Sequence, residues 1–425
     1  MSFNIDIDNK PVLTGPWYLH HKHWNDIALD YIYAYEHIPP DATHHIELNA
    51  YVYQSIYRLI YESNLLEGEG LSKGETKRIA DEYFPHLPSS YDSIKKMAQV
   101  CKTPFDLVFS TNCESAIDDI CSKYDNLIPT ISFKNKSRGF KEVVQHHMAY
   151  MQSNVKSSRY MSECYKRFLS SVFIIIYSSK YNIPPSPEDL AAATHNDESM
   201  TTALKTLDPD SKLAISILNK LNMSPPLDFK YVILATRKLN VNIYPVSLFT
   251  EDGIKSLHKT LARGLIDKDA GVPAGEYRID NRIVRDLDVI FPSPELIPEC
   301  MHQFISRANS LIDSLCENPQ NLFEVAARVS HEFVRIHPFP DFNGRLSRLL
   351  LTVILNTFGV PFPVTLRGDK KGRHRYLSSL RKANKSHLKP YITLIAMRVA
   401  ESFMEIDANL SLAGLPSVLT FLKRT

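Results

Sequence analysis

Apolar residues recur every three to four positions along much of this 425-residue chain, which is the pattern of amphipathic helices. Residues 1–40, rich in Trp, Tyr, His and Pro, lack this period, and we expect an irregular, packed segment there. The periodic stretches predict helices over residues 46–66, 140–152, 253–265, 295–315, 322–334, 349–358, 373–384 and 388–404. A chain with this pattern is mostly α-helical.

One stretch departs from the helical period. Residues 283–284 and 287–291 are short β-like runs around polar turn residues, which predicts a hairpin. A polar linker is expected around residues 184–202. The most apolar run, 168–177, contains two serines and is too short to span a bilayer, so a buried element is the better interpretation.

Composition narrows the range of functions. The chain is 44% apolar and 23% charged, as in globular proteins with two or three cores, and its net charge of +2 gives no case for nucleic acid or an acidic membrane as partner. The six cysteines show no CxxC or metal-ligand spacing. The start of the chain lacks the pattern of a signal peptide. We therefore expect a cytoplasmic protein with reduced thiols.

The candidate chemistry is concentrated in residues 337–348, called here the signature segment. It has the sequence His-Pro-Phe-Pro-Asp-Phe-Asn-Gly-Arg-Leu-Ser-Arg, between two predicted helices. Pro338 and Pro340 favour extended backbone before them, so the first helix must end near His337. Asn343 and Gly344 suit a turn that opens the next helix. The free N–H groups at such a helix start bind anions readily.

The side chains of the signature segment suit phosphate chemistry. Arg345 and Arg348 lie on one face of the second helix and could hold oxygens of a di- or triphosphate. Asp341 offers a hard oxygen ligand for Mg²⁺. His337 could accept a proton from a hydroxyl, and Asn343 could donate to a phosphate oxygen. Each residue alone is explained as well by a turn or a helix end; the whole set favours phosphate transfer.

The signature segment resembles the motif of Fic proteins, which have the Fido fold: His-x-Phe-x-(Asp/Glu)-(Gly/Ala)-Asn-(Gly/Lys)-Arg-x-x-Arg. The resemblance implies transfer of AMP from ATP to a Ser, Thr or Tyr hydroxyl of a target protein. It implies His337 as the base and Asp341 as the Mg²⁺ ligand. The residues implied to hold the α- and β-phosphates are Asn343, Gly344 and Arg345, and Arg348 is implied for the γ-phosphate.

Phe342 departs from that motif, which usually has Gly or Ala at this position. A small residue lets backbone approach a phosphate closely. A Phe could still donate its N–H to the nucleotide while its ring points away. Phe342 therefore stays among the expected nucleotide-binding residues.

Two other stretches also resemble the family. Residues 373–384 resemble its Tyr-Tyr-x-x-Leu-x-x-Ala-Asn helix, which implies that Tyr376, Leu377 and Asn384 border adenine and ribose. The predicted hairpin matches the family's flap, whose edge can pair with an extended target segment. Val289 is our candidate flap contact with the nucleotide.

Residues 63–68 end the first predicted helix. Taken alone, Ser63, Glu67 and Gly68 form a polar face with a glycine that ends the helix. Together with the signature segment they resemble the family's inhibitory motif, (Ser/Thr)-x-x-x-Glu-(Gly/Asn). The resemblance implies that Glu67 pairs with Arg348 and competes with the γ-phosphate.

We therefore predict a mostly α Fido core with a β-hairpin flap and helical insertions, which uses ATP and Mg²⁺. Its expected parts are an N-terminal region with the inhibitory helix (1–84), helical insertions with part of the core (85–249), a catalytic core (250–405) and a C-terminal tail (406–425). Two alternatives stay open: a hydrolase that removes AMP, and a weak nucleotide-binding module. The sequence also leaves a homodimer open.

Overall fold

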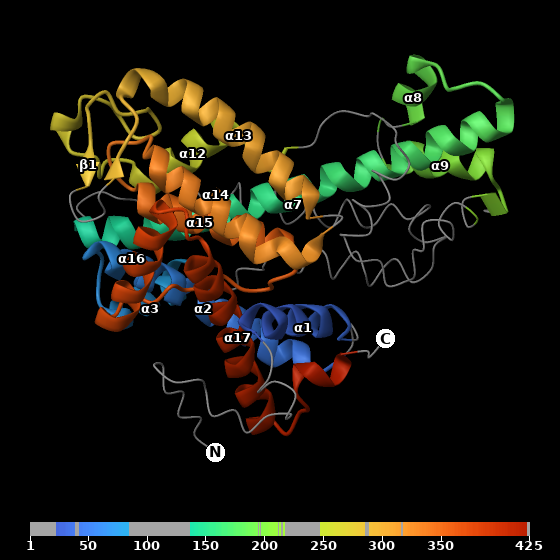
Figure 1. The fold of residues 1–425 in the computed structure, drawn as a ribbon. Helices are drawn as coiled ribbons and strands as arrows, with labels where there is room; N and C mark the ends of the chain where they lie inside the picture. The colour runs from blue at the N-terminus through green and yellow to red at the C-terminus, as the bar shows by residue number, and fades with distance from the viewer. Residues whose placement is uncertain are drawn as a thin grey trace.

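The computed structural model describes residues 23–38, 42–84, 137–193, 195, 197–210, 212–213, 216, 247–284, 289–315 and 318–422. Figure 1 shows that helices make up almost all of the regular structure in these residues, which confirms the mostly α prediction. Among these helices, none has both the length and the apolar character needed to cross a bilayer.

Helix α15 (Asn343–Thr357) is the buried centre of the core. All of its residues except Gly344 are buried. It packs against α14 (Leu322–Ile336), which precedes it in the chain, and against α7 (Arg138–Tyr181), α2 (His44–Glu67) and α12 (Glu251–Ala262). The apolar period predicted this helix only from residue 349, because its first turn carries polar side chains, whereas the motif placed its start at Asn343 and Gly344, where the structure has it. The early start places two arginines in the protein interior.

Helix α7 is far longer than the predicted stretch 140–152. It has 44 residues and runs across the molecule to α8 (Pro187–Ala193) and α9 (Asp197–Leu207), as Figure 1 shows. The apolar run 168–177 lies inside it. The linker predicted for 184–202 is wrong, because α8 and α9 occupy this stretch and α9 packs back on α7.

Helix α1 (Trp24–Glu36) contradicts the irregular segment predicted for residues 1–40. Its buried residues include Ile27, Tyr31 and Tyr35, which follow a helical four-residue spacing. Tyr31 stacks on Phe403 of α17 (Lys389–Leu412), with ring centres 5.1 Å apart. Because this distant partner stabilises the helix, the spacing of its tyrosines did not by itself predict a helix. Helix α17 itself continues beyond residue 406, where the tail was expected to begin.

The predicted hairpin is present. Strands β1 (Ile283–Val284) and β2 (Val289–Ile290) are antiparallel, with Ile283 opposite Ile290 and Val284 opposite Val289. Residues 285–288 and the side chain of Val289 lie outside the described part. The remaining elements are α3 (Lys73–Tyr83), η3 (Lys268–Ala270), η5 (Pro294–Leu296), α13 (Ile297–Ser314), η6 (Pro319–Asn321), α16 (Lys370–Asn384) and η7 (Val418–Phe421).

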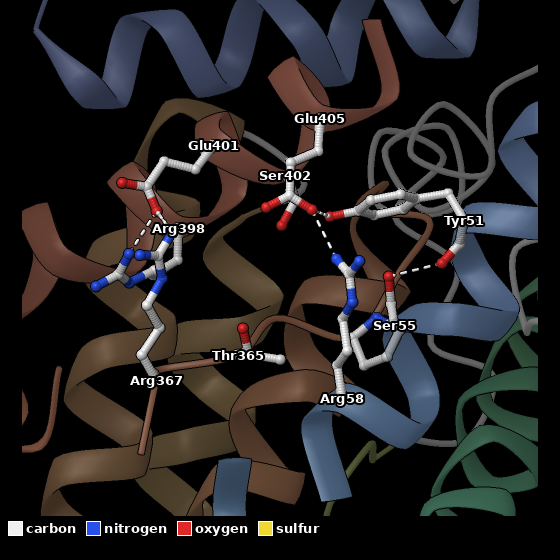
Figure 2. Close-up of a pocket in the computed structure, with 10 residues that line it drawn as sticks. Tyr51, Ser55, Arg58, Thr365, Arg367, Arg398, Glu401, Ser402 and Glu405 are labelled. Atoms are coloured by element: carbon white, nitrogen blue, oxygen red, sulfur yellow. Dashed lines mark hydrogen bonds and ion pairs between the residues drawn. The ribbon is translucent and has the colours of Figure 1, made fainter. Parts of the chain in front are cut away.

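A polar junction joins α2 to α17 around a cavity of about 30 Å³, shown in Figure 2. Arg58 of α2 pairs with Glu405 at 2.6 Å, and Tyr51 donates to the same carboxylate oxygen at 3.1 Å. Arg367 and Arg398 both pair with Glu401. The two contacts with Glu405 fix α2 against α17.

Gly368, which follows this junction, lies directly against α2. Its N–H donates to the carboxylate of Glu62. A Cβ at Gly368 would lie 2.7 Å from the Glu62 carbonyl oxygen and 2.7 Å from Leu65 Cβ. The absent side chain therefore allows the close approach.

We expect Gly368→Ala to lower the free energy of unfolding by about 1–3 kcal/mol, because α2 must move away from the new methyl group. Gly74→Ala in α3 is the matched control, since a Cβ there meets nothing within 4 Å. The control should keep or slightly raise stability. Urea denaturation of both variants measures the difference, and equal stabilities would contradict the tight contact.

Candidate active site

His337 ends α14 in the left-handed conformation, with φ 51° and ψ 56°. The base of the hairpin consists of Arg278, which precedes β1, and Phe291 and Pro292, which follow β2. Arg278 donates from Nε to the His337 carbonyl at 2.8 Å and from Nη2 to the Pro292 carbonyl at 2.6 Å. The Phe291 ring stacks on the imidazole with centres 4.2 Å apart. The hairpin base thus fixes both the backbone and the ring of His337.

The electrostatic surroundings keep His337 neutral. Burial, helped by the positive charge of Arg278, lowers the pKa of His337 to about 4. A neutral imidazole at pH 7 can accept a proton, as a general base must. Arg278 itself escaped the sequence reasoning, because its neighbours Tyr277 and Ile279 carry no motif and its partners are distant in the chain.

The Asn343 side chain closes the loop between α14 and α15. Its Oδ1 accepts from the Phe339 N–H at 3.0 Å, and its Nδ2 donates to the Phe339 carbonyl at 2.7 Å. We expected this amide to reach a phosphate, but both of its ends are bonded inside the loop. Asn343 therefore shapes the loop that presents the start of α15.

His258 of α12 supports the same loop, although no sequence motif pointed to it. Its Nδ1 accepts from the Gly275 N–H at 2.8 Å, so Nε2 carries the hydrogen and donates to the Asp341 carbonyl at 3.1 Å. Its ring stacks on Phe339 with centres 3.8 Å apart. Burial lowers the pKa of His258 to about 4, and the neutral form is the one that makes both bonds.

Arg345 is a buried cation with unused donors. It is 3% exposed, and its Nε and Nη1 have no hydrogen-bond partner. Its guanidinium carbon lies 3.6 Å from the centre of the Phe342 ring, and Nη1 lies 3.8 Å from the Glu142 carboxylate. Buried donors of this kind are costly unless a ligand pairs with them. At the first turn of α15 these donors could pair with an anion.

Arg348, by contrast, is bonded to α2. Its Nε donates to Ser63 Oγ at 2.8 Å, and its Nη2 donates to the Ser63 carbonyl at 2.9 Å and to Glu67 Oε1 at 2.6 Å. Burial acts to raise the pKa of Glu67, but the charge of Arg348, its hydrogen bond and the charges of Arg345 and Arg373 together outweigh burial and lower this pKa, so the carboxylate is ionised. The predicted pairing of Glu67 with Arg348 is therefore present.

Gly344 gives the Glu67 carboxylate room at the start of α15. A Cβ at Gly344 would lie 2.5 Å from Glu67 Oε1. Gly68 ends α2 just beyond, with a left-handed φ of 78°. Residues 63–68 and the signature segment thus meet over one helix N-terminus.

Two residues that the sequence did not reveal hold the end of α2 in place. Arg373 of α16 donates to the Leu66 carbonyl at 2.8 Å. Glu142 of α7 accepts from the Gly70 N–H at 3.0 Å and is only 1% exposed. Glu142 therefore contacts both the chain after α2 and Arg345.

Asp341 is exposed, and its Oδ1 accepts from the Phe342 N–H at 2.6 Å. In the described part of the chain, no three His, Cys, Asp or Glu side chains cluster in a way that could hold a metal ion. A cation at Asp341 would need phosphate oxygens and water as its other ligands, which is the usual arrangement for Mg²⁺. The carboxylate fits that role.

The residues expected near adenine and ribose lie on α16. Tyr376 is buried, with its ring centre 5.9 Å from the Arg348 guanidinium carbon, and Leu377 is half-buried. Asn384 Oδ1 is bonded to Nε2 of His331, 2.8 Å away. This bond makes His331 a packed helix residue and ties α16 to α14.

The fold and the site together define a helical protein of the Fido type, with a histidine and an arginine cradle on the loop between two core helices. A model of the Fic/DOC family matches residues 248–355. A Fido domain-containing protein of Dictyostelium discoideum is 35% identical over 116 residues, covering 26% of this chain and 77% of that protein. The chain therefore belongs to the Fic/DOC family.

A second curated relative matches over a smaller share of its length. "Protein adenylyltransferase Fic" of Nematostella vectensis is 34% identical over 149 residues, which are 35% of this chain and 31% of that protein. A solved Fic domain containing signaling protein of Bacteroides thetaiotaomicron aligns with 95% of this chain and 99% of its own, at 14% identity and a TM-score of 0.48.

The low pKa of His258 in the folded protein makes the free energy of unfolding depend on pH. Its pKa is about 4 in the folded protein and about 6.5 in an unfolded chain, so the unfolded state binds more protons between these values. The contribution of His258 is full above about pH 6.5 and is lost as the pH falls toward 4. His258→Leu should cost about 2–4 kcal/mol at pH 7 and weaken this pH dependence.

Thermal unfolding of the parent and of His258→Leu at pH 7 and pH 5 tests this expectation. His374→Leu, at an exposed position of α16, is the control and should change little. If the stability of His258→Leu depends on pH as that of the parent does, protonation of His258 is not coupled to unfolding, and the expectation is wrong.

Proposed function

We propose that this protein transfers AMP from ATP to a Ser, Thr or Tyr hydroxyl of a target protein. One observation supports the proposal: the buried Arg345 guanidinium has donors without a hydrogen-bond partner, and the neutral His337 imidazole lies at the start of the loop that leads into Arg345's helix. The first group needs an anion and the second can take a proton. The triphosphate of ATP would supply the anion, and the hydroxyl of the target protein would supply the proton.

The proposed step is substitution at the α-phosphorus. The target oxygen attacks as His337 accepts its proton, the bond from the α-phosphorus to the bridging oxygen breaks, and pyrophosphate leaves. Arg345 and the N–H groups at the start of α15 would stabilise the phosphate charge. Asp341 would hold Mg²⁺ together with phosphate oxygens, and the bound ion would neutralise further charge.

The hairpin is the expected docking place for the target. Its base carries Arg278 and Phe291, which hold His337. An extended peptide paired with the strand edge would bring a side-chain hydroxyl near the imidazole whatever the neighbouring residues are. The name protein adenylyltransferase, which relatives from Nematostella vectensis and Aedes aegypti bear, supports the proposed reaction.

We also propose that Glu67 inhibits the reaction. Its carboxylate is bonded to Arg348, the group assigned to the γ-phosphate, and lies against Gly344. ATP must displace this carboxylate or bind with its phosphates misplaced. Negative charge at the γ-phosphate position also opposes the nucleotide directly.

Glu67→Gly should raise AMP transfer at least about tenfold, because the loss of one competing ion pair of roughly 1.4 kcal/mol or more suffices for that factor. His337→Ala should abolish transfer in both backgrounds. Incubation with α-labelled and γ-labelled ATP measures which phosphate reaches protein. Glu69→Gly, two residues from Glu67 and also exposed, is the matched control and should leave the rate unchanged.

The same experiment separates the alternatives. Only α-label on protein supports AMP transfer. Release of label from a previously modified target, dependent on Glu67, would identify a hydrolase. Nucleotide binding without either event would identify a regulatory module and end the proposal.

Asp341→Asn tests the metal. In the Glu67→Gly background we expect it to raise the Mg²⁺ concentration needed for half-maximal transfer by about 10–100-fold, since a neutral amide binds the cation far more weakly than a carboxylate. It should also remove the effect of Mg²⁺ on ATP affinity, measured by calorimetry without turnover. Asp269→Asn, at an exposed position, is the control. An unchanged Mg²⁺ requirement would place the ion elsewhere.

A further inference from the structure

Phe342 occupies a backbone position that its residue type disfavours. Its φ is 63° and its ψ is 5°, in the left-handed region, where a residue with a Cβ pays a cost that Gly avoids. The family motif has Gly or Ala at this position. Phe342 is nevertheless 2% exposed and belongs to the hydrophobic core. The ring must therefore contribute something that offsets the backbone cost.

The ring contacts the face of Arg345. The guanidinium carbon lies 3.6 Å from the ring centre, close enough for a strong cation–π contact in a buried setting. The backbone of Phe342 is also fixed, because its N–H donates to Asp341 Oδ1 at 2.6 Å and its carbonyl accepts from the Leu346 N–H at 2.9 Å. The platform under Arg345 is therefore rigid.

A guanidinium that is held by stacking keeps its N–H donors available for a ligand, whereas one that is held by hydrogen bonds does not. A guanidinium offers its donors along its edge and its π-surface on its face. Arg348 is restrained through its edge, by Ser63 and Glu67, so those donors are occupied. Arg345 is restrained through its face. Its Nε and Nη1 have no hydrogen-bond partner in the protein, and the Glu142 carboxylate lies 3.8 Å from Nη1.

We propose that Phe342 is a positioning residue for nucleotide binding: its ring holds the Arg345 guanidinium in one orientation while the donor edge stays free for a phosphate. This inference rests on the proposed function, since it takes the ATP phosphates as the anion. It carries an unusual consequence. Phe342→Gly restores the residue of the family motif and relieves the backbone, yet it should weaken phosphate binding, because Arg345 must then be ordered by the ligand.

The experiment compares ATP and adenosine binding to the full-length Phe342→Gly, Phe342→Leu and Phe342→Tyr variants, made in the Glu67→Gly background. For Gly and Leu we expect ATP affinity to fall about fivefold to tenfold with adenosine affinity unchanged, and the KM for ATP to rise more than kcat falls. Tyr keeps the aromatic face and should bind ATP as the Glu67→Gly parent does.

Phe358→Leu is the matched control, because Phe358 is also 2% exposed and lies at the other end of α15. It should lower thermal stability and leave ATP affinity unchanged. Parent-like ATP affinity in both Gly and Leu variants, or an equal loss for ATP and adenosine, would overturn the inference. Failure of the Glu67→Gly parent to bind ATP at all would instead overturn the proposed function, and this inference with it.

Discussion

The buried guanidinium of Arg348 is the interaction on which the rest of this structure depends. It is 2% exposed and has a full positive charge that water does not solvate. A buried charge of this kind must be paired. Its partners, Ser63 and Glu67, come from a helix 281 or more residues earlier in the chain. This requirement binds the N-terminal region to the signature segment.

Much of the surrounding architecture serves to bring α2 to this position. The polar junction with α17, the Glu62 contact with Gly368 and the Arg373 bond to Leu66 all act on α2 from the C-terminal third of the chain. Glu142 of α7 then holds the chain that follows α2. Because these contacts lie along the length of the helix, Glu67 approaches Arg348 in a fixed geometry and without the entropy cost of ordering a free segment.

The sequence predicted what is local and missed what depends on distant partners. Helix periods revealed α2, α12, α13 and α14, and the motif located the loop between α14 and α15 because its residues are contiguous. Helix α1 was missed because several of its buried positions are tyrosines, which pack on α17. His258, Arg278 and Glu142 were missed because each is a single polar residue whose meaning comes from a buried partner far along the chain.

The two signature arginines also show why a motif does not give a geometry. From spacing alone, Arg345 and Arg348 were equivalent forks on one helix face. In the structure one is held through its face and the other through its edge, and only the first has spare donors. The difference arises from Phe342 and Ser63, neither of which the spacing of the arginines could reveal.

The exposure of the two charges suggests how the contact with α2 can open. The Glu67 side chain is 36% exposed, while that of Arg348 is 3% exposed. If Glu67 leaves, its carboxylate regains water at little cost, but Arg348 stays buried and still needs an anion. Arg348 can have the Glu67 carboxylate, a phosphate or no anion beside it, and the state without an anion is therefore the least favourable of the three. Under the proposed function, a γ-phosphate and the Glu67 carboxylate satisfy the same demand in turn, so activation is an exchange of anions at one cation.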